Sequence, residues 1–163
     1  MELSADLPSQ LVPLAWLLGS WAGAGVGGHP EPEEYRFGQE LDVTHDGRAF
    51  LSWTSRTWLL DDAGERVRPL TSEAGFWRPQ PDGALEVVLA HAEGYAEVWV
   101  GTVAGPRIDL HTDVVARTQS ASDYTAGHRL YGLVEGDLAW AYDVAARGEP
   151  LQASMSARLK RVP

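Results

Sequence analysis

Apolar residues follow a helical period at the start of the chain and an alternating, strand-like period after it. The first apolar positions recur at helical spacing: Leu11, Leu14, Leu17 and Leu18. We therefore expect a short helix over residues 4–18 with one buried face. Ser4 or Asp6 is expected to cap it, Pro8 suits its first turn, and Pro13 is expected to break it into two pieces.

From residue 19 onward, short alternating segments are separated by turn signals rich in Gly, Asp and Pro. The expected strands lie near residues 19–27, 34–44, 48–58, 71–79, 84–91, 95–103, 107–115, 126–135, 137–145 and 151–161. Strands at this spacing, joined by short turns, indicate an antiparallel meander. Closure removes exposed edges, so the pattern predicts an all-β fold. We expect a closed barrel of about ten strands over residues 19–161, capped by the N-terminal helix, in a single domain of residues 1–163.

Composition and charge narrow the functional classes. The 163 residues are 44% hydrophobic and include seven Trp, which suits a sizeable core or a pocket for a flat apolar ligand. The formal charge of −10 argues against nucleic acid as a partner, because phosphate binding needs clustered cations. The absence of Cys excludes disulfides and thiolate chemistry. The acidic start and the lack of a long apolar run predict no membrane association and a cytoplasmic location.

A run of glycines near the start of the barrel, Gly23, Gly25 and Gly28, fits the spacing of a dinucleotide-binding turn. That motif needs a strand before the glycines and a helix after them. Here a helix precedes the run, and two Pro at positions 30 and 32 follow it. We therefore expect these glycines to bend a first strand around a barrel corner.

Several motifs resemble the nitrobindin family of small barrels, which are similar in architecture to fatty-acid-binding proteins. The segment after the helix fits G-x-W-x-G-x-G through Gly19, Trp21, Gly23 and Gly25. The resemblance extends from about Leu11 to Arg161. Its other segments are Glu73-Ala74-Gly75-Phe76 with Arg78-Pro79, Glu86 to His91 with Gly94 and Glu97-Val98, Arg129-Leu130-Tyr131, Glu135-Gly136-Asp137-Leu138, and Gly148 to Gln152.

The resemblance implies haem b inside the barrel, held by one proximal His on the last strand, with nitric oxide binding and peroxynitrite isomerisation as the associated chemistry. In the family this strand reads approximately L-Q-x-H, but here it reads Leu151-Gln152-Ala153-Ser154. A Ser hydroxyl is a poor iron ligand, whereas a proximal His is the usual haem anchor. We therefore expect no cofactor, no specific haem binding and no isomerase activity.

Alternation along the last strand places Gln152, Ser154, Ser156 and Arg158 on one face, and Ala153, Met155, Ala157 and Leu159 on the other. By the resemblance, the Ser154 face looks into the barrel and the apolar face points outward. Two compatible accounts follow. The interior is polar and hydrated, and a partner covers the outer apolar face, as in a homodimer.

Candidate ligand-binding residues are Arg129, Tyr131, Ser154, Arg158 and Trp21. Arg129 and Tyr131 share a strand face and resemble the carboxylate anchor of fatty-acid-binding proteins; Arg158 is a candidate to join them. The alternative is an internal ion pair of Arg129 with Glu73 or Asp143. Trp21 is expected mainly to pack under the helix at the base of the barrel.

Catalytic and metal sites are not expected. The five His lie at positions 29, 45, 91, 111 and 128, and no two have the spacing of H-x-H or H-x-x-x-H. His91 is the one expected nearest the mouth of the barrel. No G-x-S-x-G nucleophile turn occurs.

The sequence thus predicts a non-catalytic binder of a small apolar or amphipathic ligand, with an anionic ligand included, in the barrel cavity. The second hypothesis is a haem protein with altered axial ligation that handles nitric oxide or peroxynitrite. The third is a structural or interaction module without a ligand.

Overall fold

The chain forms a closed barrel of ten antiparallel strands in a computed structural model that describes residues 6–28, 34–146 and 148–163. Each strand pairs with its neighbours in sequence, and the last pairs with the first, so the meander closes on itself. The strands are β1 (Gly19–Gly27), β2 (Tyr35–Thr44), β3 (Leu51–Leu60), β4 (Arg66–Pro79), β5 (Ala84–His91), β6 (Tyr95–Val103), β7 (Arg107–Arg117), β8 (Tyr124–Val134), β9 (Asp137–Ala146) and β10 (Gln152–Arg161). The predicted fold class is confirmed.

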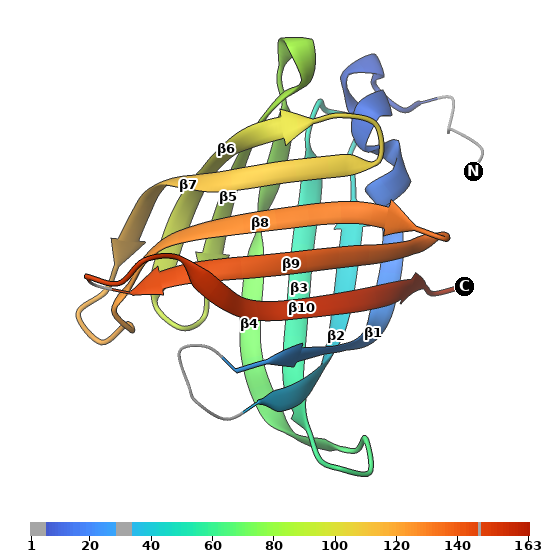
Figure 1. Ribbon diagram of the computed structural model, residues 1–163. Coiled ribbons are helices and arrows are strands. Elements are labelled where there is room, and N and C mark those ends of the chain that lie inside the picture. Colours follow the sequence, from blue (N-terminus) through green and yellow to red (C-terminus); the bar gives the residue numbers. More distant parts are fainter. Residues whose placement is uncertain (1–5, 29–33, 147) are drawn as a thin grey trace.

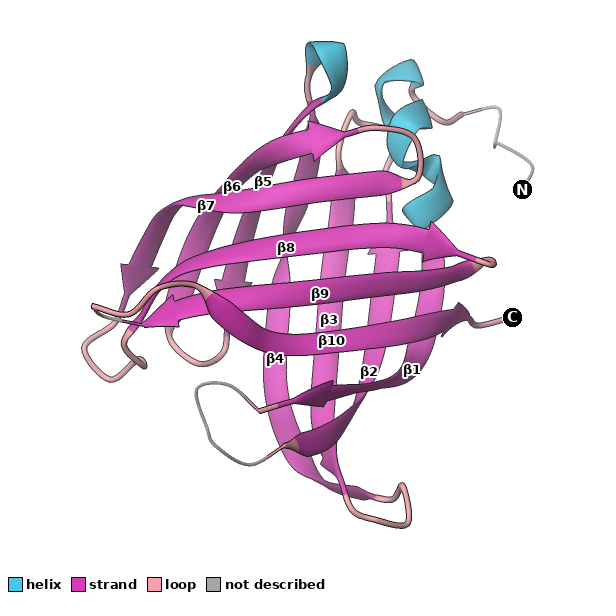
Figure 2. Cartoon of the chain, viewed as in Figure 1, coloured by secondary structure: helices cyan, strands magenta, loops and turns pink. Residues whose placement is uncertain are grey.

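The barrel is flattened into two layers. β7 to β10 run across the front of the view in Figure 1, and β1 to β4 run behind them at a steep angle. Figure 2 shows that helical turns occupy one end of this strand framework. Apolar side chains on the inner faces of both layers fill the space between them, including Trp21, Trp53, Trp77 and Trp99.

The N-terminal helix differs from the expectation. It is a 3₁₀ helix over Ser9–Leu17 with Pro13 inside it, and no side chain within the described part of the chain caps its start. Pro13 does not break it, because a short helix docked through buried leucines tolerates the loss of one backbone donor. Ser4, one of the expected caps, lies outside the described residues. Among the residues described, no helix has the length and apolar character needed to cross a membrane.

The strand boundaries agree closely with the expected ones except at β4, which begins at Arg66 rather than near residue 71. Pro69 lies inside this strand opposite Trp58, next to a shift in the β3–β4 register after Arg56. Proline is tolerated in a sheet at such irregular positions because no regular ladder donor is lost there.

Candidate functional site

A polar chamber lies inside the barrel, toward the end away from the N-terminal helix. Its walls come from alternate, inward-facing positions of eight strands. The lining residues are Gln39, Trp53, Ser55, Thr57, Thr71, Glu73, His91, Tyr95, Arg129, Tyr131, Trp140, Tyr142 and Met155. Its volume is about 70 Å³. A polar cavity of this size accommodates a few water molecules.

An ion pair between Arg129 on β8 and Glu73 on β4 crosses the interior. Arg129 Nη1 donates to Glu73 Oε2 at 2.8 Å and Nη2 donates to Oε1 at 3.2 Å. Nη1 also donates to the Tyr131 hydroxyl at 3.1 Å. Burial opposes the charge of Arg129, but the carboxylate of Glu73 outweighs it and raises the pKa of the guanidinium. The guanidinium is therefore charged, and its two terminal nitrogens donate to Glu73 and Tyr131.

A second polar group joins the β5–β6 hairpin to β8. Glu97 is 2% exposed, and its two carboxylate oxygens contact His91 Nε2 and the Tyr124 hydroxyl. Although burial raises the pKa of Glu97, the hydrogen bond from His91 and the charge of Arg129 lower it below its ordinary value. An ionised carboxylate only accepts hydrogen bonds, so His91 and Tyr124 are the donors.

The phenols around the chamber are held in their protonated form. Burial raises the pKa of Tyr131 to about 12. Burial likewise raises the pKa values of Tyr95, Tyr124 and Tyr142. At neutral pH these phenols therefore present neutral hydroxyls to the interior.

The structure places the sequence candidates as follows. Arg129 and Tyr131 lie together inside the barrel, and the internal partner of Arg129 is Glu73, one of the two alternatives weighed from the sequence. Trp21 lies at the base, where its indole Nε1 donates to the Leu17 carbonyl at 2.9 Å. It is fully buried in the core and does not line the chamber.

The expected faces of the last strand are wrong. The register of β10 shifts between Ala153 and Met155, so Ser154 is an extra residue at a bulge. Beyond the bulge, Met155, Ala157 and Leu159 face inward, and Met155, which was expected to face away, lines the chamber. One extra residue in a strand turns every later side chain to the opposite face. Strict alternation counted from Ser154 assumes that no such residue is present.

Arg158 therefore lies outside the barrel rather than with Arg129. Its side chain pairs with Asp137 at 2.8 Å and with Glu135 at 3.1 Å. The apolar face of β10 is buried in the core, so it provides no surface for a partner. The homodimer was expected because this face would be exposed. It stays a prediction, but β10 does not supply its interface.

Sequence reasoning missed the role of Glu97. It occupies an inward position between Tyr95 and Trp99, where alternation predicts an apolar side chain. A lone acid at such a position signals a buried polar partner, and that signal was available in the expected strand over residues 95–103. His91, expected nearest the mouth of the barrel, has a buried side chain that lines the chamber, and its partner Glu97 was not predicted.

Known proteins of one family match this chain over almost its whole length. Residues 10–161 match the family described as a THAP4-like, heme-binding beta-barrel domain. The chain is 55% identical to the ferric nitrobindin-like protein of Kineococcus radiotolerans, covering 99% of this chain and 98% of that one. It is 52% identical to the peroxynitrite isomerase of Nocardioides sp., covering 98% of each chain. The crystal structure of Rv2717c from M. tuberculosis superposes with a TM-score of 0.86 at 35% identity, covering 97% of this chain and 100% of that one.

Proposed function

The chain belongs to the family of THAP4-like, heme-binding β-barrel domains, and from this premise we propose that it is a non-catalytic binder of a small amphipathic ligand. The ligand's polar end enters the chamber beside Arg129, Tyr131 and Trp140. The observation that carries the proposal is the chamber itself, which combines neutral hydroxyls, indole rings and a thioether in a volume of about 70 Å³. This mixture of apolar walls and a few polar groups matches the lining of small-molecule sites, although the small volume admits only the polar end of a ligand.

The residues present do not fit haem b. The chamber is several times smaller than the roughly 300 Å³ at which pockets for drug-sized ligands begin. Ser154 stands where the resemblance places the haem-ligating His and lies at a bulge. His91 Nε2 donates to the Glu97 carboxylate, so this nitrogen has no lone pair for iron. These observations support a function without axial haem ligation.

The charge balance of the chamber favours a neutral head group over an anionic one. Glu73 already compensates the charge of Arg129 through two hydrogen bonds. An anionic ligand has to displace that carboxylate or share the guanidinium with it, and like charges brought together in a buried site repel. We therefore propose that an alcohol of a given chain length binds at least as tightly as the corresponding carboxylate.

Haemin titration followed by absorption spectroscopy tests the exclusion of haem. The parent protein is expected to leave the spectrum of free haemin unchanged. A sharp, ligated Soret band in the parent would overturn the proposal in favour of haem-dependent handling of nitric oxide or peroxynitrite, the activity for which the Nocardioides relative is named. The Ser154→His variant shows why the parent does not bind haem. A ligated Soret band in this variant means that only the axial ligand is missing from the parent. No such band means that the filled interior excludes the macrocycle.

Intrinsic fluorescence tests ligand binding, because Trp53 and Trp140 line the chamber. Hexanol and hexanoate are the probes. We expect a saturable change in emission with hexanol and a weaker one with hexanoate, both reduced in Trp140→Phe. The control is Trp16→Phe, because Trp16 lies in the N-terminal helix and does not line the chamber. No saturable change with either probe would favour a barrel without a ligand.

A further inference from the structure

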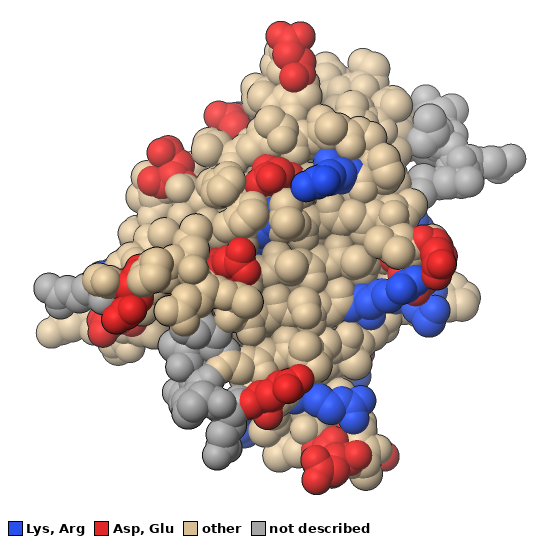
Figure 3. Space-filling view, viewed as in Figure 1, with Lys and Arg blue, Asp and Glu red and all other residues tan. Residues whose placement is uncertain are grey.

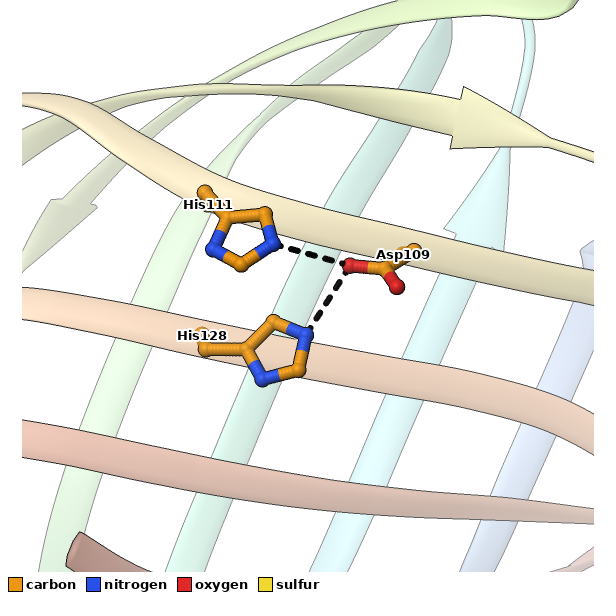
Figure 4. A group of neighbouring side chains, drawn as sticks. All are labelled: Asp109, His111 and His128. Atoms are coloured by element: carbon orange, nitrogen blue, oxygen red, sulfur yellow. Dashed lines mark hydrogen bonds and ion pairs between the residues drawn. The ribbon is translucent and has the colours of Figure 1, made fainter. Parts of the chain in front are cut away.

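Two histidines and an aspartate meet on the outer face of the barrel, away from the chamber. Asp109 and His111 are two residues apart on β7 and therefore share a face. His128 on β8 is the direct register partner of His111. Figure 4 shows the three side chains converging above the two strands. Chain spacing alone conceals this group, because the histidines are brought together by strand pairing.

The two imidazoles share one carboxylate oxygen of Asp109. Asp109 Oδ1 lies 2.9 Å from His128 Nε2 and 3.2 Å from His111 Nε2. The two imidazole rings are stacked with centroids 4.3 Å apart and an interplanar angle of 11°. All three ligand atoms lie within 4.8 Å of one another.

These distances suit a small divalent ion. Zn²⁺ binds imidazole nitrogen and carboxylate oxygen at about 2.0–2.2 Å, so neighbouring ligand atoms in a tetrahedral site lie roughly 3.3 Å apart. To reach it, the two stacked imidazoles have to turn so that both Nε2 lone pairs point at the ion. Two imidazoles and one carboxylate fill three positions and leave the fourth for water.

A fourth residue supports the orientation of His128. Asp143 on β9 places Oδ2 3.6 Å from His128 Nδ1, the nitrogen that faces away from Asp109. A carboxylate beside the second nitrogen of a metal-ligating imidazole fixes its tautomer and increases its basicity. Asp143 is thus positioned to act as the outer partner of a metal-bound His128.

The group also lies where the pairing of two strands ends. The β7–β8 ladder runs from Arg107 and Gly132 to His111 and His128, although both strands continue beyond it. The next connection is made by a side chain, since Gly127 N donates to Thr112 Oγ1 at 3.0 Å. An ion at this point would clamp β7 to β8 where the backbone ladder stops.

We propose that Asp109, His111 and His128 form a Zn²⁺ site that clips β7 to β8 on the outer face of the barrel. The formal charge of −10 favours the approach of cations, and Figure 3 shows acidic side chains spread over the face of the molecule that includes these strands. Nitrogen-rich ligands select zinc over the oxygen-preferring Ca²⁺ and Mg²⁺. The site is independent of the chamber and of the function proposed for it.

Isothermal titration of the untagged, chelator-treated protein with ZnCl₂ tests the proposal. We expect one ion per chain, with binding weakened about tenfold or more in His128→Asn and in His111→Asn. The matched control is His45→Asn, which removes a half-buried loop histidine outside the cluster and is expected to leave the affinity unchanged. Ca²⁺ and Mg²⁺ are expected not to compete.

Two further measurements connect binding to these residues. Zn²⁺ is expected to raise the melting temperature of the parent and of His45→Asn but not of His128→Asn, because an ion that binds only the folded state stabilises it. Co²⁺ is expected to give visible absorption bands in the parent that disappear in His111→Asn. Absence of Zn²⁺ binding, or equal affinity in the parent and both cluster variants, would overturn the proposal. Circular dichroism of each variant verifies that it is folded.

Discussion

Arg129 shows how a single buried charge is stabilised inside this barrel. It is 5% exposed, and its guanidinium lies over the rings of Trp99 and Tyr142 while pairing with Glu73. Removal of one partner from a buried ion pair leaves an uncompensated charge, which costs about 3–5 kcal/mol. We expect Arg129→Met to lower the free energy of unfolding by about 3 kcal/mol in urea denaturation, and the double variant Arg129→Met/Glu73→Gln to recover part of that loss.

The control at this scale is the same substitution at Arg158. Arg158 also pairs with two carboxylates, Asp137 and Glu135, but on the outer surface, where solvent screens the interaction. Arg158→Met should leave the midpoint of urea denaturation nearly unchanged. Equal losses in the two single variants would mean that burial of the Arg129 pair contributes nothing special to stability.

At the scale of the element, three glycines of β1, Gly23, Gly25 and Gly27, lie where an added Cβ would collide with neighbouring atoms. A Cβ on Gly25 would lie 2.2 Å from the Ser156 carbonyl oxygen and 2.6 Å from the Phe37 ring. Neighbouring backbone cannot move aside without disturbing the β1–β10 pairing that closes the barrel. We expect Gly25→Ala to destabilise the protein by about 2–3 kcal/mol, measured by urea denaturation.

Gly132 on β8 provides the matched control for Gly25. The nearest heavy atom to its added Cβ is the Pro106 carbonyl oxygen at 3.6 Å, an ordinary contact. Gly132→Ala should therefore be neutral, or slightly stabilising because it restricts the unfolded chain. A loss in Gly132→Ala as large as that in Gly25→Ala would indicate that strand glycines matter here for flexibility rather than for close approach.

The strands could be predicted because each ends in a turn signal that acts locally, as at Gly94 and Gly136, which both have positive φ. The faces of β10 could not, because the bulge at Ser154 arises from pairing with β9 and has no local signature. The same distinction applies to the chamber. Alternation predicted that Arg129 and Tyr131 share a face, but the choice of Glu73 over Asp143 depends on which strand lies across the barrel.

Across the whole molecule, the buried ionisable groups should limit stability at both extremes of pH. On the acid side, the pKa of Glu97 is lowered in the folded state, so the unfolded chain takes up the proton first. The stability that Glu97 contributes is present above its ordinary pKa of about 4.3 and is lost as the pH falls through the lower folded value. We expect the urea midpoint to fall in this range, and Glu97→Gln to make the dependence shallower.

On the alkaline side the folded-state pKa values are raised rather than lowered, and the result is again a loss of stability. The pKa of Tyr131 rises from its ordinary value to about 12, and those of Tyr95, Tyr124 and Tyr142 are also raised. Phenols in the unfolded chain ionise near pH 10, so stability is complete below that pH and declines as the pH rises toward the folded values. Urea midpoints measured from pH 8 to 11.5 should therefore fall above about pH 10, and Tyr131→Phe should reduce the slope. An unchanged slope in that variant would mean that Tyr131 ionises as readily in the folded barrel as in the unfolded chain, which its burial beside Trp53 and Trp77 opposes.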